Sequence, residues 1–144
     1  MTRERGLAIM EIQLSLKQFR RLLDLVYTGN WIMNSTRGDD RIAEFDEVES
    51  LLFAKCAETG MEKLVETRGV MPLPSRAFAE GGIHEAIMDY EDTVFFEILA
   101  EELARRDIIA EGGNEEDTEE INKRIGAYIA EFELNGTDNI SLDI

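Results

Sequence analysis

The stretch LSLKQFRRLLDLVYTGNWIM, residues 14–33, decides the fold class. Its apolar residues recur at the spacing of one helix face: Leu16, Phe19, Leu22, Leu23, Val26 and Met33. Ser15 and Gln18 have the S-x-x-Q spacing of a capping box, in which each side chain can satisfy the backbone N–H of the other residue. Gly29 costs about 1 kcal/mol against alanine inside a helix, so it either ends the helix or permits a close helix contact. We expect one helix from Ser15 to about Thr36.

Three further segments have the same helical pattern, over residues 38–60, 83–106 and 118–135. In the first of them one apolar stripe consists of Ile42, Phe45, Val48, Leu52 and Cys56. Asp92 or Thr93 could cap a new helix start, which makes a break or kink there an alternative to one continuous helix. The pattern therefore predicts a mainly α fold: a compact helical domain of about four to five helices.

Two short segments at the ends of the chain alternate apolar and polar residues, which is typical of strands. They are residues 10–14, MEIQL, and residues 140–144, ISLDI. The simplest arrangement pairs them as a two-stranded β-ribbon of N- and C-terminal segments, packed on the helices because an isolated ribbon is only marginally stable. Residues 69–75, which contain Pro72 and Pro74, are expected to form a loop.

Length and composition indicate one domain of ordinary size. The chain has 144 residues, of which 44% are hydrophobic and 32% are charged, a composition typical of globular proteins. No repeat and no long linker divides it, so we predict a single helical domain over residues 10–144. Residues 1–9 are expected to be a disordered arm, or to precede the true start if translation begins at Met10.

Negative charge dominates the chain, with 31 acidic and 15 basic residues and a formal net charge of −16. Residues 1–41 hold seven basic and five acidic residues, a net of +2, whereas residues 42–144 hold eight basic and 26 acidic residues, a net of −18. Such a charge repels free nucleic acid and anionic membranes and attracts a basic protein. The alternative is that the acidity serves solubility alone.

Cys56 is the single cysteine, so no disulfide can form within the chain. This usage fits a reducing compartment, and the apolar run at residues 6–10 is too short for the core of a signal peptide. No stretch approaches the roughly 18 apolar residues of a membrane span. We therefore expect a cytoplasmic protein.

Few residues offer catalytic or metal-binding chemistry. Cys56 lies on the apolar stripe of its helix, where a buried thiol has a raised pKa and is inert. His84 is the only histidine, and it is expected to be an exposed or capping residue, with a role as ligand or base as the alternative. One cysteine and one histidine make a zinc site improbable. The pairs Glu97 with Glu101 and Glu85 with Asp89 share helix faces and leave an oxygen-only Ca²⁺ or Mg²⁺ site open.

No nucleotide-binding glycine motif is present, and we assign no catalytic residue and no cofactor. The basic and aromatic residues of the first helix form one cluster: Lys17, Arg20, Arg21, Tyr27 and Trp31. The cluster is either a small nucleic-acid patch or the solvated face of the helix, docked against the protein's own carboxylates. Trp31 lies off the main apolar stripe, where a large aromatic side chain could anchor an interface.

Three stretches resemble a group of small acidic bacterial proteins known only as hypothetical: residues 14–31, residues 83–92 and residues 103–107. The resemblance covers most of the chain after Met10. Its motifs are helix-face patterns, so it implies no activity.

The leading hypothesis is a non-enzymatic intracellular protein–protein interaction or regulatory module with an acidic surface. A special case is mimicry of nucleic acid. The alternative is a small metal-binding protein or enzyme that uses carboxylates with His84. A third hypothesis is a self-associating protein, a homo-oligomer.

Overall fold

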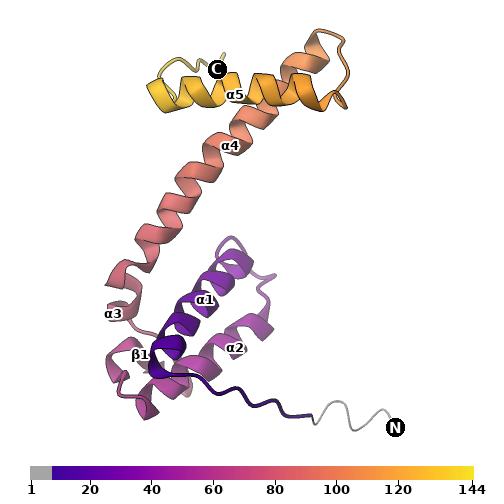
Figure 1. Cartoon of the computed structure of the whole chain (residues 1–144). Helices are drawn as coiled ribbons and strands as arrows, with labels where there is room; N and C mark the ends of the chain where they lie inside the picture. The colour runs from indigo at the N-terminus through magenta and orange to yellow at the C-terminus, as the bar shows by residue number, and fades with distance from the viewer. Residues whose placement is uncertain (1–7) are drawn as a thin grey trace. The chain divides into compact units, whose positions relative to one another are not determined.

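The computed structural model describes residues 8–144 (Figure 1). Helices make up 66% of the chain, which confirms the mainly α class. The chain divides into two compact units, Met1–His84 and Glu85–Ile144. The single domain over residues 10–144 stays a prediction. Most of the expected N-terminal arm, residues 1–7, lies outside the described residues.

Helix α1 (Leu16–Asn34) begins where the sequence predicts. Both halves of the capping box are present: Gln18 N donates to Ser15 Oγ (3.1 Å) and Ser15 N donates to Gln18 Oε1 (2.9 Å). The helix continues through Gly29, and no neighbouring atom comes within 4 Å of the position a Cβ would take there. Gly29 therefore neither ends the helix nor permits a close contact. Phe19, Leu23, Asn30 and Asn34 form its buried face.

The core of the first unit joins α1 to helix α2 (Ala43–Ala54) and to the short helix α3 (Arg76–Phe78). Its buried members are Phe19, Leu23, Phe53, Cys56 and Phe78. Phe53 and Phe78 meet edge to face, with ring centroids 4.9 Å apart, an arrangement that aromatic quadrupoles favour. Two 3₁₀ turns, Lys55–Glu58 and Glu62–Leu64, follow α2 and close the core.

The two-stranded antiparallel sheet is present, but its position differs from the prediction. Strand β1 (Val65–Arg68) pairs with strand β2 (Met71–Pro74) in a hairpin, and β2 packs against α2. The predicted loop at residues 69–75 is thus mostly a strand. Proline is tolerated because each strand of a two-stranded sheet has a free edge where no N–H donor is needed. Residues 10–14 and 140–144 form no strand and are exposed, so the predicted terminal ribbon is wrong.

Helix α4 (His84–Ala110) follows a wide helical turn, Ala79–Ile83, in which Gly82 takes a φ of +111°. The helix runs unbroken through Asp92 and Thr93. The Thr93 hydroxyl donates to the Asp89 carbonyl oxygen (3.0 Å) and does not cap a new start, so the structure has the continuous helix and not the alternative break. No helix in the described part of the chain is long and apolar enough to cross a membrane.

The second unit consists of α4 from Glu85 onward and helix α5 (Thr118–Asn135), joined by the expected acidic loop. Asp117 caps α5 by accepting from Glu120 N (3.2 Å), and Gly136 ends it. The buried residues along the two helices are Ile87, Ala100, Ala104, Ile108, Ile121 and Phe132. Ala100 and Ala104, whose side chains are the smallest after glycine, are fully buried on α4, and α5 crosses α4 in this unit (Figure 1).

Replacement of Gly29 by alanine tests the interpretation of α1. Gly29→Ala should raise the free energy of unfolding by about 0.5–1 kcal/mol, because the site is helical and open and alanine has the higher helix propensity. Gly60→Ala is the matched control: its φ of +75° should make the same change destabilising by roughly 1–2 kcal/mol. Urea unfolding followed by circular dichroism measures both. A destabilised Gly29→Ala protein would contradict the assignment of an open helical site.

Candidate functional site

The second unit carries most of the negative charge. It holds four basic and 18 acidic residues, a net charge of −14. The first unit holds 11 basic and 13 acidic residues, a net charge of −2. The boundary between near-neutral and acidic sequence therefore coincides with the boundary between the units, 43 residues later than the division at residue 41 drawn from the sequence.

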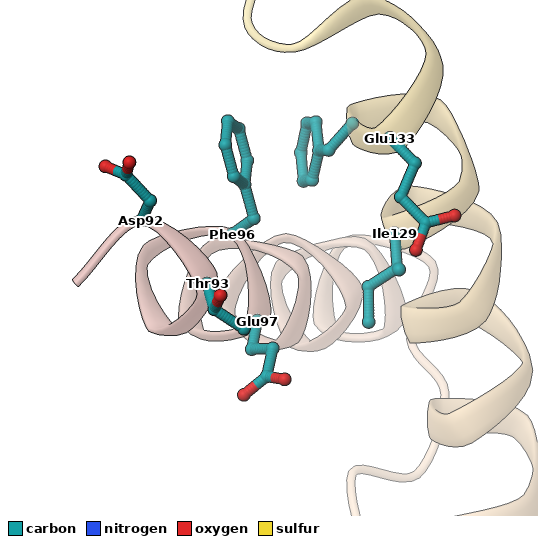
Figure 2. Close-up of a pocket in the computed structure, with 7 residues that line it drawn as sticks. Asp92, Thr93, Phe96, Glu97, Ile129 and Glu133 are labelled. Carbon is teal, nitrogen blue, oxygen red and sulfur yellow. The ribbon is translucent and has the colours of Figure 1, made fainter. Parts of the chain in front are cut away.

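A pocket of about 390 Å³ lies where α4 and α5 cross (Figure 2). We call it the crossing pocket, and its lining residues are Asp92, Thr93, Phe96, Glu97, Ile129, Phe132 and Glu133. The first four lie within six consecutive positions of α4, and the last three lie within five consecutive positions of α5. Helical geometry places residues three and four apart on one face, so each helix presents a continuous wall.

The floor of the crossing pocket is apolar. Phe132 is buried and Phe96 is half-buried, and their ring centroids lie 5.4 Å apart. Phe96, from α4, and Ile129, from α5, project into the space between the helices (Figure 2). The two rings contact each other and, together with Ile129, form an apolar surface between the helices.

Three carboxylates surround this floor: Asp92, Glu97 and Glu133. None of them forms an ion pair or a side-chain hydrogen bond with another described residue. Three of the four basic residues of the unit are engaged elsewhere: Arg105 with Glu101 (2.8 Å), Arg106 with Asp107 (2.7 Å), and Arg124 with both Glu111 (2.6 Å) and Glu120 (2.8 Å). The rim of the pocket therefore keeps its negative charge.

The α4–α5 connection is held by polar contacts. The Tyr128 hydroxyl donates to Asp107, and Arg124 donates to both carboxylate oxygens of Glu111 (3.0 and 2.6 Å). These contacts lower the pKa of the Asp107 carboxyl, chiefly through the Tyr128 hydroxyl, and lower the pKa of the Glu111 carboxyl through Arg124. The carboxylates of Asp107 and Glu111 therefore hold α4, α5 and their connection together.

A second pocket, of about 210 Å³, lies in the first unit. We call it the α1 pocket, and its lining residues are Tyr27, Asn30, Trp31, Asn34, Ser35, Arg41 and Glu49. Beside it the structure brings together three residues that the sequence analysis singled out. Tyr27 Oη and His84 Nε2 are joined by a hydrogen bond of 2.6 Å, and the His84 ring meets the Trp31 ring edge to face at 4.7 Å. His84 is thus a partly buried hydrogen-bonding residue and neither exposed nor a cap.

Polar residues of the α1 pocket form a network that the sequence analysis missed. The side-chain Nδ2 of Asn34 donates to Asn30 Oδ1 (2.7 Å) and to the backbone carbonyl of Ile42 (3.0 Å). The side-chain Oδ1 of Asn34 accepts from the backbone N–H of Ile42 (2.8 Å). Asn30 in turn donates to Asp46 (3.0 Å), which also accepts two bonds from Arg41. The sequence did contain one indication of this network: Asn30 and Asn34 stand seven and eleven positions after Leu23, a spacing that places them on the buried face of the helix.

Glu49 is the most unusual member of the α1 pocket, because its side chain is charged and only 8% exposed. Burial raises the pKa of its carboxyl, and the charge of Asp46 adds to the rise, while Asn30 and Arg41 act in the opposite direction. Burial and the charge of Glu49 also raise the pKa of Tyr27, so the phenol stays protonated near neutral pH.

Of the other candidate residues, Glu97 lines the crossing pocket and the rest lie outside both pockets. Cys56 is fully buried and burial raises its pKa, as predicted for an inert structural thiol. Arg20 and Arg21 both pair with Asp24 (2.7 and 2.9 Å), which supports the interpretation of a solvated helix face docked on its own carboxylate. The pairs Glu97 with Glu101 and Glu85 with Asp89 are exposed. Among residues 8–144 no group of three or more His, Cys, Asp or Glu side chains is arranged to hold a metal ion.

Comparison of the chain with protein-family models, with curated proteins and with solved structures finds no match. The resemblance to small acidic bacterial proteins stays a prediction. Function is therefore inferred from the geometry of the two pockets.

The buried carboxyl of Glu49 makes a prediction for stability against pH. A pKa raised in the folded state means that protonation of Glu49 stabilises the fold, and this contribution is lost as pH rises through the folded pKa. Glu49→Gln removes the ionisation, so the variant should match the parent protein in acid and exceed it increasingly as pH rises from the ordinary glutamate range toward neutrality. Urea unfolding across about pH 4–8 measures the difference. Glu47→Gln, on the exposed face of the same helix, is the control and should show no such trend.

Proposed function

We propose that this protein is a non-enzymatic interaction module whose second unit binds a basic, amphipathic segment of another protein in the crossing pocket. The observation that supports it is the combination of an apolar aromatic floor with three unpaired carboxylates on the rim. Lysine and arginine side chains carry an aliphatic stem and a cationic end, and they can lay the stem on the rings while the charge reaches a carboxylate.

Charge favours a different protein over a second copy of this chain as the partner. Two second units, each with a net charge of −14, would repel each other if they met through the same acidic face. A basic segment instead gains from the same field, which raises the rate of encounter and makes binding sensitive to salt.

Exposed apolar side chains on α4 extend the contact area beyond the crossing pocket. Met88 stands four positions before Asp92 and Tyr90 stands three positions before Thr93, and both side chains are more than half exposed. An amphipathic helix presents apolar residues three and four positions apart, so it can fill the pocket and cover neighbouring apolar residues at the same time. The hypotheses of a carboxylate site with His84 and of a cytoplasmic location remain hypotheses beside this proposal.

The rim carboxylates provide the test. A synthetic amphipathic peptide of lysine and leucine should bind, and its affinity should fall with salt. The triple change Asp92→Asn, Glu97→Gln and Glu133→Gln should weaken binding by more than tenfold, since each exposed pair contributes up to about 1 kcal/mol and the three act together. Fluorescence anisotropy of the labelled peptide measures the dissociation constant.

A matched control separates local recognition from general attraction. Glu102→Gln, Glu115→Gln and Glu116→Gln remove the same three charges from exposed positions of the same unit, away from the crossing pocket. This control should weaken binding only slightly. Equal loss in both triple variants would reject the pocket and leave only non-specific attraction. Concentration-dependent light scattering would show whether a second copy is the occupant instead.

A further inference from the structure

The α1 pocket contains a carboxylate that forms no ion pair. Arg41 donates two hydrogen bonds to Asp46 (Nε to Oδ2, 2.6 Å; Nη2 to Oδ1, 2.7 Å), so these two residues neutralise each other. Glu49 lines the same pocket, is 8% exposed and forms no ion pair with any described residue, while Asn30 and the charge of Arg41 favour its charged form. A cation in the pocket would therefore meet a negative charge that no salt bridge neutralises.

Two aromatic residues, Tyr27 and Trp31, line the same pocket as Glu49. Tyr27 and Trp31 are one helical turn apart on α1, and their rings are stacked with centroids 6.4 Å apart and planes 23° apart. His84 fixes both rings, through the hydrogen bond to Tyr27 and the edge contact to Trp31. Tryptophan and tyrosine faces attract organic cations.

The pocket is small. Its volume of about 210 Å³ is roughly half that of the crossing pocket, about 390 Å³. Pockets for drug-sized ligands begin at about 300 Å³. The space therefore suits a molecule of a few non-hydrogen atoms.

We propose that the α1 pocket binds a small organic monocation of the alkylammonium class, with Glu49 as the counter-charge and Tyr27 and Trp31 as the aromatic wall. The positive charge pairs with the Glu49 carboxylate, which has no ion-pair partner of its own, and the alkyl groups lie against the rings. The site belongs to the first unit and is independent of the crossing pocket in the second.

Trp31 is the only tryptophan in the chain, so its fluorescence reports directly on the occupancy of this pocket. Tetramethylammonium chloride and ethylammonium chloride are the probes, each titrated against sodium chloride at equal ionic strength. Saturable change in Trp31 fluorescence, together with a rise in the thermal midpoint, is expected for at least one probe and not for sodium chloride. Absence of a saturable response to both probes would overturn the proposal.

Two variants assign the binding to the named residues. Glu49→Gln should weaken the probe's affinity about tenfold or more, whereas Glu47→Gln, the same change on an exposed position of α2, should leave it unchanged. Trp31→Leu, followed by the thermal midpoint, should also weaken binding about tenfold. Equal affinities in the parent and Glu49→Gln proteins, or an equal loss in Glu47→Gln, would overturn the assignment. If Glu49→Gln failed to fold, the Trp31→Leu variant would decide.

The dependence of binding on pH gives an independent readout. The groups that face Glu49 are Tyr27 from α1, Asp46 from α2 and Arg41 from the segment before α2. Among Glu49 and these three groups, Glu49 is the only carboxyl whose pKa is raised above its ordinary value. The affinity of the parent protein should therefore rise with pH as Glu49 ionises. The affinity of Glu49→Gln should stay flat. A parent protein with flat affinity would remove Glu49 from the site.

Discussion

One buried amide determines how the first unit is assembled. The Asn34 side chain is 1% exposed and bonds to both the N–H and the carbonyl of Ile42, as a neighbouring strand would. It thereby fixes the segment before α2 against the end of α1 and aligns Asn30 with Asp46. The α1 pocket exists because this network holds polar groups in the interior, where each must find a partner.

Features that depend on local sequence were predicted, whereas features that depend on contacts between helices, such as this network, were not. Helix α1, its capping box and the burial of Cys56 follow from local patterns, and all three are confirmed. The expected stripe on α2 is wrong in part, because Phe45 and Val48 are exposed while Glu49 faces inward. A pattern of apolar residues cannot reveal that asparagines on another helix will attract acidic residues to the buried side. Pro72 and Pro74 led to the prediction of a loop where β2 forms. Proline fits in this strand because one edge of β2 has no partner strand, and the sequence does not show which strands have a free edge.

The candidate sites were only partly visible in the sequence. Tyr27, Trp31 and His84 were each recognised as unusual, but their contact joins positions 57 and 53 residues apart along the chain. The crossing pocket had no motif at all, because its seven residues come from two helices and consist of common residue types. The charge of this pocket comes from three carboxylates that have no basic partner. The packing of α4 and α5 determines which carboxylates those are, so the sequence alone does not show them.

The hairpin has a consequence for aggregation through its strand edges. A short, exposed pair of strands offers unpaired N–H and carbonyl groups that can recruit further strands into aggregates. Pro72 and Pro74 leave β2 with fewer donors for an incoming chain, and the hairpin is only four residues long on each side. The two residues that make this strand hard to recognise also make it a poor template for aggregation.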